Sequence, residues 1–119
     1  MKKRQTYKEK RPWGSFTQFT YNVKTTVKIL IVNPGQLLSD QRHRHREELW
    51  VPLDEGGYVV INGKKRMVSP QEEIIITVGT WHRVGCEETV SRPIRILEIS
   101  FGDFDENDIE RRDDIYNRI

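Results

Sequence analysis

Short segments rich in β-branched and aromatic residues run through most of the chain, and turn-forming residues separate them about every ten positions. The clearest apolar segments lie at 27–32 and 92–101. NPG at 33–35 and NGKK at 62–65 are turns, and the Asn-Gly pair of the second is typical of a two-residue β-hairpin. This pattern predicts an all-β protein, either an antiparallel barrel or a sandwich of two sheets.

The two ends of the chain depart from this pattern and carry opposite charges. Residues 1–10 form a basic arm, and residues 105–119 form an acidic tail. The tail alone has helical spacing, and Asp105 or Asn107 is a suitable helix cap. We therefore expect one domain over residues 1–119 with a short C-terminal helix. The arm and the tail either pair, within one chain or between two, or are simply solvated.

The composition excludes several classes of protein. The net charge is +2, which gives no bulk attraction to nucleic acid. The single cysteine, Cys86, rules out an internal disulfide framework, and no separate His and carboxylate remain to activate it as a nucleophile. No apolar run reaches membrane-spanning length, and the basic N-terminus lacks the apolar stretch of a signal peptide. We expect a cytoplasmic protein that binds neither nucleic acid nor membrane.

All three histidines lie in two short stretches, QRHRHREE at 41–48 and WHR at 81–83. In a strand, alternate side chains point to opposite faces, so Gln41, His43 and His45 would share one face. The alternating arginines would form a solvated outer face: Arg42, Arg44 and Arg46. A polar face of this kind suits a barrel interior only if something binds there.

A divalent metal ion would account for that polar face, because imidazole, carboxylate and amide oxygen are all metal ligands. Glu47 or Glu48 supplies the carboxylate, and His82, from a strand much later in the chain, supplies the last imidazole. Ligands from distant hairpins converge in a β-barrel. This set of ligands accepts Zn, Mn, Fe, Co or Ni, and the sequence does not choose among them.

The spacing of these residues resembles the two metal-binding motifs of the cupin superfamily. The first runs from Gly35 through Gln41 and His43 to Glu48, with Gln in place of the usual first His, and the second is G-x-x-H at 79–82. Five stretches between residues 11 and 118 resemble, more specifically, the C-terminal cupin domain of type II mannose-6-phosphate isomerases: RPWGSF, VNPGQLLSDQ, H-x-H-R-x-E-x-W, G-x-x-HR and DI-x-R-x-DD-x-Y-x-R.

This resemblance implies a cupin double-stranded β-helix, which is a jelly-roll barrel, in a protein that forms a homodimer. It implies Gln41, His43, Glu48 and His82 as the metal ligands. It also implies metal-dependent aldose-ketose isomerisation of a sugar phosphate, above all of mannose 6-phosphate to fructose 6-phosphate through an enediol. The cation would stabilise negative charge on two adjacent substrate oxygens.

The same chemistry needs a general base and cations for the phosphate. His45 and Glu48 are the candidate bases, since a base must lie within hydrogen-bond reach of the proton that it removes. For the phosphate we expect Lys28, which matches a basic position of the family, then Arg83, and thirdly Arg11.

In many relatives this domain follows a nucleotidyltransferase. The chain has no Gly-rich nucleotide loop, so we expect no nucleotidyltransferase activity. Two other interpretations stay open: a non-catalytic cupin that binds a sugar or sugar nucleotide, and another metal-dependent cupin enzyme such as an epimerase or a dioxygenase. Gln41 disfavours the dioxygenase, whose usual ligands are three His and one Glu. Departures from the family pattern leave room for a different substrate, and they lie at Glu55, Thr77 and Cys86.

Overall fold

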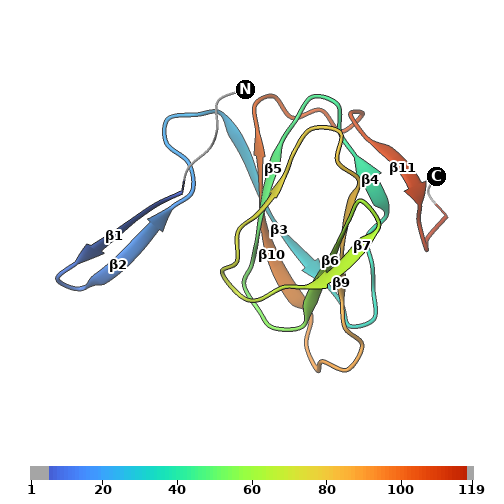
Figure 1. Ribbon diagram of the computed structural model, residues 1–119, viewed down its shortest axis with the longest axis horizontal. Coiled ribbons are helices and arrows are strands. Elements are labelled where there is room, and N and C mark those ends of the chain that lie inside the picture. The colour runs from blue at the N-terminus through green and yellow to red at the C-terminus, as the bar shows by residue number, and fades with distance from the viewer. Residues whose placement is uncertain (1–5, 118–119) are drawn as a thin grey trace.

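The computed structural model describes residues 6–117, and this range contains β-strands, turns and loops but no helix (Figure 1). Segments rich in β-branched residues and frequent turn residues favour strands over helices. The strands are β1 (Tyr7–Arg11), β2 (Gly14–Gln18), β3 (Thr25–Val32), β4 (Asp40–Arg42), β5 (Glu48–Pro52), β6 (Gly57–Ile61), β7 (Lys64–Met67), β8 (Ile74–Ile76), β9 (His82–Cys86), β10 (Ile94–Phe101) and β11 (Glu110–Asp113).

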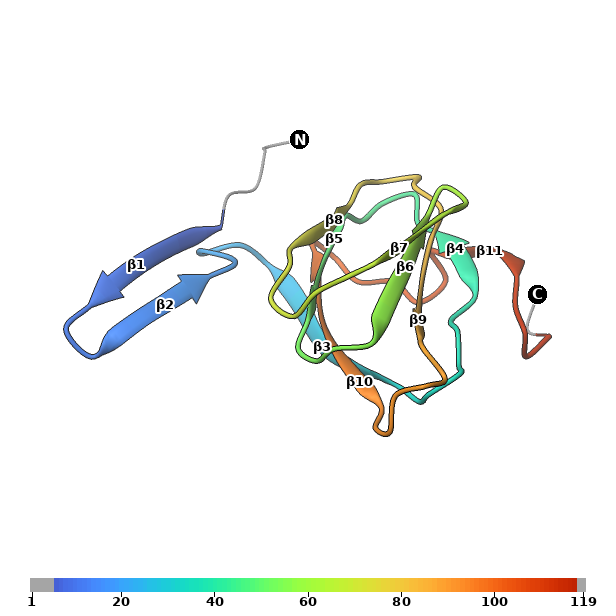
Figure 2. The same cartoon turned by 60° about the horizontal axis from the view of Figure 1, so that its bottom comes forward.

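The strands form two larger sheets and a separate hairpin (Figures 1 and 2). One sheet has four strands in the order β3-β10-β5-β8, and the other has five in the order β11-β4-β9-β6-β7. Neighbouring strands are antiparallel in both sheets. Within the described residues the two sheets share no strand, so the jelly roll is an open sandwich rather than a closed barrel. The all-β prediction is confirmed.

The main hydrophobic core fills the space between the two sheets. In each strand every second side chain points inward, and these inward positions carry mostly branched aliphatic residues. The cluster joins residues of the four-stranded sheet with residues of the five-stranded sheet and the loops between them: Val32, Trp50, Val59, Val68, Ile74, Ile76, Val84, Cys86, Ile94 and Ile96. Trp50 lies in this core and is 1% exposed.

The outer face of the four-stranded sheet is also apolar. Leu49, Val51, Ile99 and Phe101 form a second buried cluster on this face, with Phe19 packed against it. The edge strand β3 continues the same face, and its three outward apolar side chains are each more than half exposed: Val27, Ile29 and Ile31. A sheet face of this kind is typical of an interaction surface.

The β1–β2 hairpin extends away from the sandwich, as both views show (Figures 1 and 2). Trp13 lies at its tip and is 73% exposed. Near its base, the Thr6 hydroxyl donates to the Glu73 carboxylate, and Lys8 Nζ lies 3.6 Å from the same residue. A two-stranded hairpin is marginally stable by itself, so these contacts hold its base against the sandwich.

The predicted C-terminal helix is wrong over the described residues. The backbone N–H of Asp108 donates a hydrogen bond to the Asp105 carbonyl and closes a turn, and β11 then pairs with β4. Cross-strand ion pairs join Glu110 to Arg42 and Arg112 to Asp40. These pairs and the sheet hydrogen bonds outweigh a weak helical spacing. Residues 118–119 of the predicted helix and residues 1–5 of the predicted arm lie outside the described range.

Among residues 6–117 there is no helix long and apolar enough to cross a membrane. The expected cytoplasmic location stays a prediction.

Candidate metal centre

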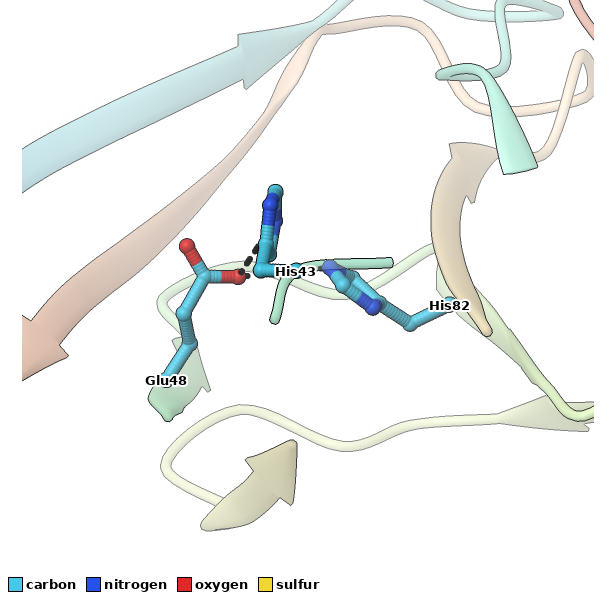
Figure 3. Close-up of side chains that lie close together, drawn as sticks. All are labelled: His43, Glu48 and His82. Carbon is cyan, nitrogen blue, oxygen red and sulfur yellow. Dashed lines mark ion pairs between the residues drawn. The ribbon is translucent and has the colours of Figure 1, made fainter. Parts of the chain in front are cut away.

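Three buried side chains point toward one another (Figure 3). His43 lies in the loop after β4, Glu48 begins β5, and His82 begins β9. Their ligand atoms all lie within 4.8 Å of one another. Glu48 Oε1 is 3.7 Å from His43 Nε2 and 3.3 Å from His82 Nε2. The three residues are at most 3% exposed.

Hydrogen bonds to the backbone fix which nitrogen of each imidazole faces the site. His43 Nδ1 lies 2.6 Å from the carbonyl oxygen of Asp108, and His82 Nδ1 lies 2.8 Å from that of Thr80. A carbonyl oxygen only accepts, so Nδ1 is the protonated nitrogen in both residues. In the neutral ring Nε2 then carries a lone pair, and this arrangement is typical of metal-ligating histidines.

Glu48 is oriented by two donors on its other oxygen. Arg46 Nε lies 3.2 Å from Oε2, and the Ser100 hydroxyl donates to Oε2 over 3.1 Å. Oε1 is left facing the imidazoles. Glu48 Oε1 and His82 Nε2 are both buried, and neither makes a hydrogen bond among the described residues. Two unsatisfied buried acceptors side by side are costly unless a cation lies between them.

The local electrostatics keep the Glu48 carboxylate ionised. Burial alone would raise the pKa of Glu48, but His82, His43 and Arg46 outweigh it and lower the pKa to about 2. Burial lowers the pKa of His43 and so favours its neutral form. An ionised carboxylate beside neutral imidazole is the form in which these groups bind a divalent cation. His43, Glu48 and His82 therefore make a candidate metal site, and this donor set does not single out one metal.

The structure places the predicted fourth ligand, Gln41, on the same side as His82. The two residues are directly paired between β4 and β9, and paired residues point to the same face. Gln41 Nε2 lies 3.3 Å from the Ser39 hydroxyl, which leaves the amide oxygen as the atom available to a ligand. The alternative carboxylate, Glu47, lies beside Leu49 on the other face of the sheet.

The predicted alternation after Gln41 does not hold, because β4 ends at Arg42 and the chain continues as a loop. His45 is exposed and lies beside a surface hollow lined by Arg44 and Asp108 rather than with the three ligand atoms. Arg46, expected on a solvated face, is only 7% exposed and contacts Glu48. A two-residue period applies only while the strand continues.

A pocket of about 480 Å³ lies beside the candidate metal site. Its lining includes Lys28, Gln41, Arg46 and Glu98. Phe104 closes one side, with Lys28 Nζ 4.2 Å and the Arg46 guanidinium 4.3 Å from its ring centroid. Such cation–π contacts hold both cations in place.

The other two predicted phosphate ligands lie elsewhere. Arg83 points away from the pocket, since its guanidinium donates to the Leu38 carbonyl and pairs with Asp113 at 2.8 Å. Arg11 lies near the hairpin tip, where it pairs with Glu9.

Arg46 and Glu98 are pocket residues that the sequence did not predict. A signal for Glu98 was available, because it is the one charged residue among the apolar positions of ILEISF. No comparable signal marked Arg46, which looks like its exposed neighbours.

Comparison with known proteins agrees with this geometry. Residues 1–114 match the family model described as mannose-6-phosphate isomerase C-terminal. The chain belongs to this family. Members of the family among the curated relatives include the mannose-1-phosphate guanylyltransferase ManC of Salmonella typhimurium, 34% identical over 92% of this chain. A mannose-1-phosphate guanylyltransferase of Escherichia coli is 36% identical over 91%, and the alginate biosynthesis protein AlgA of Pseudomonas aeruginosa is 32% identical over 91%.

The chain spans 22 to 23% of the length of these curated relatives. Solved structures support the cupin-type fold of this family member. A cupin 2 domain-containing protein from Halorhodospira halophila has a TM-score of 0.67 at 22% identity, covering 92% of this chain and 68% of its own. The capsular polysaccharide assembling protein CapF from Staphylococcus aureus has a TM-score of 0.66 at 19% identity, covering 90% and 34%.

These relatives correct the predicted activity. The prediction of an isomerase without nucleotidyltransferase activity is wrong, because the relatives that carry this domain are named for guanylyl transfer to mannose 1-phosphate. The motifs identified the domain family, but the family is not specific for isomerisation. The lack of a Gly-rich loop in 119 residues also carries no weight, since this segment corresponds to about a fifth of the relatives' length.

Proposed function

We propose that this cupin domain binds a divalent metal ion and, beside it, a mannose phosphate, in association with mannose 1-phosphate guanylyl transfer. The observation that carries the proposal is the pair of buried, unsatisfied acceptors, Glu48 Oε1 and His82 Nε2, 3.3 Å apart. His43 contributes the third ligand atom. The choice of sugar comes from the names of the relatives, which act on mannose 1-phosphate.

Four residues would hold the metal ion: His43, Glu48 and His82 through the converging atoms, and Gln41 through its amide oxygen. Two imidazoles, a carboxylate and an amide suit Zn, Mn, Fe, Co or Ni. When bound, the ion would act as a Lewis acid toward an oxygen of the mannose phosphate. Arg46 and Ser100 position Glu48 by binding its second oxygen, which keeps Oε1 directed at the histidines.

The pocket offers cations for the phosphate of the ligand. Lys28 stacks on Phe104 and forms no ion pair within residues 6–117, so its ammonium group is available to an anion. Arg111 also lines the pocket, and its Nε is buried without a hydrogen-bond partner in the described range. A phosphate would satisfy both groups by charge-assisted hydrogen bonds. The catalytic roles predicted for His45 and Glu48 belonged to isomerisation and are not retained.

Calorimetric titration with mannose 1-phosphate tests the proposal on protein stripped with EDTA and on protein reloaded with Zn²⁺ or Mn²⁺. We expect binding to the metal-loaded protein and much weaker binding to the stripped protein. Lys28→Met should weaken binding about tenfold or more, because one hydrogen bond to a charged group is lost. Lys24→Met is the matched control, since Lys24 is 74% exposed and pairs with Asp103. Absence of binding to the wild-type protein in both states would overturn the proposal.

The proposal includes a homodimer in which a second copy covers the outer face of the four-stranded sheet. Val27, Ile29 and Ile31 support this interface, because three exposed apolar side chains lie in a row on an edge strand. Sedimentation equilibrium should give a dimer for the wild-type chain and a monomer for Ile29→Lys. A wild-type chain that sediments as a monomer would contradict the dimer without affecting the metal site.

A further inference from the structure

We infer that Glu98 is a ligand-binding residue whose free carboxylate oxygen accepts hydrogen bonds from the hydroxyl groups of the sugar; this inference rests on the proposed function. Neither the predicted site residues nor the family resemblance includes Glu98. Its position in the sheet, the use of its two oxygens and the charges around it support this role.

Glu98 lies on the inner face of β10, between two pocket residues. It is paired with Lys28 of β3 on one side and with Trp50 of β5 on the other. Two residues further along the same face, Ser100 is paired with Glu48 and donates to it. Positions two apart in a strand are about 6.6 Å apart, so Glu98 lies one inward position along β10 from the residue that binds Glu48.

One oxygen of Glu98 is used within the protein and the other is not. Trp50 Nε1 donates to Oε2 over 3.0 Å, and Oε1 makes no hydrogen bond among residues 6–117. The residue is 8% exposed, and it lines the pocket. A carboxylate in this position has lost most of its water, and a ligand that donates hydrogen bonds would replace it.

The inward positions nearer the start of β10 carry the residue type that packing alone requires. Ile94 and Ile96 are apolar and each is 1% exposed in the main core. Glu98 follows them on the same face, at the point where the sandwich opens into the pocket. Burial and the nearby Glu48 carboxylate raise the pKa of Glu98, so its charge is costly in this place. Packing alone does not require a carboxyl group here.

The surrounding charges also orient the ligand. A phosphate is attracted by Lys28 and Arg111 and repelled by Glu98. Lys28 is the cross-strand neighbour of Glu98, so the phosphate lies toward Arg111 of the opposite sheet. The ring hydroxyls then face Glu98, and a carboxylate accepts from hydroxyl groups of a polyol. The class of ligand that satisfies both ends is a sugar phosphate with free ring hydroxyls.

Glu98→Gln tests the inference on the metal-loaded protein with three probes: mannose 1-phosphate, mannose and inorganic phosphate. The amide keeps the size of the side chain and an oxygen for Trp50 Nε1, so the indole contact persists. We expect binding of mannose and mannose 1-phosphate, followed by NMR titration, to weaken about tenfold, because a charge-assisted hydrogen bond becomes a neutral one. Binding of inorganic phosphate and the metal content should not decrease.

Two results would overturn the inference. One is wild-type affinity of Glu98→Gln for both sugars, which would leave Glu98 as a structural partner of Trp50. The other is an equal loss for inorganic phosphate, which would indicate a general disturbance of the pocket. If Glu98→Gln does not fold, Glu98→Asp replaces it, and the same selective loss is expected because the shorter side chain withdraws its oxygens. If the wild-type protein binds none of the three probes, the proposed function is overturned, and not the role of Glu98 alone.

Discussion

His82 Nε2 lies 3.3 Å from Glu48 Oε1, and both atoms are buried without a hydrogen bond among the described residues. In the neutral tautomer whose Nδ1 donates to the Thr80 carbonyl, the His82 ring presents a lone pair at Nε2. Two acceptors thus face each other where water is excluded. Protein interiors avoid such pairs, so this one indicates a place for a cation.

We predict that the purified protein contains close to one equivalent of a divalent metal ion and that His43→Ala removes it. His45→Ala is a matched control, because it deletes an exposed imidazole two residues away. Elemental analysis of the three proteins after gel filtration gives the metal content. Equal metal content in His43→Ala and the wild-type protein would show that the ion lies elsewhere.

Arg46 is expected to matter for stability far more than its neighbour Arg44. Arg46 is 7% exposed and its guanidinium binds Glu48 Oε2, whereas the Arg44 side chain is 74% exposed. Arg46→Met leaves a buried carboxylate without its cation and should lower the free energy of unfolding by about 3 kcal/mol. Arg44→Met should have little effect. Urea denaturation of the metal-free proteins measures both, and equal effects would mean that the Arg46–Glu48 pair contributes nothing.

The fold was largely predictable because its signals are local. Turn residues such as the Asn62-Gly63 pair and the apolar composition of β10 define strands without knowledge of tertiary contacts. The C-terminal segment was not predictable in this way. Its conformation depends on ion pairs between Glu110 and Arg42, which are 68 positions apart in the sequence. Contacts of that range leave no periodic signal.

The candidate site was likewise predictable only where its signals are local. His43, Glu48 and His82 were identifiable from spacing and resemblance, and the structure brings them together. His45 has the same chemistry as His43 but lies outside, because the strand ends at Arg42. The turn of the chain after that residue is fixed by backbone N–H groups that donate to the Asp108 carboxylate. That contact comes from the far end of the sequence.

Glu98 should make the stability of the metal-free protein depend on pH. Burial first, and the Glu48 carboxylate next, raise the pKa of Glu98 in the folded state above its unfolded value. The folded state therefore binds the proton more tightly, and stability falls as the pH rises through the folded pKa. Glu98→Gln removes this cost, so the variant should unfold at a higher temperature than the wild-type protein at about pH 7.5, and the difference should shrink at about pH 5.

Thermal unfolding in EDTA at the two pH values gives that comparison. EDTA is needed because a bound cation would itself stabilise the Glu98 charge. The exposed Glu88→Gln is the control and should show no such pH dependence. A constant difference between Glu98→Gln and the wild-type protein at both pH values would contradict the assigned direction of the shift.

Gly85 should tolerate no side chain while Tyr58 is present. The two residues are directly paired between β9 and β6, and a Cβ on Gly85 would lie 2.3 Å from the Tyr58 ring. Gly85→Ala must displace that ring. The ring also contacts Lys65, whose Nζ lies 4.2 Å from the ring centroid. The expected loss of stability is about 2 kcal/mol, as for other overpacked sites.

Tyr58→Ala removes the obstacle, so Gly85→Ala should cost little in that background. A double-mutant cycle by urea denaturation measures the coupling between the two positions. Additive losses would mean that Gly85 is required for its backbone and not for the space beneath the ring.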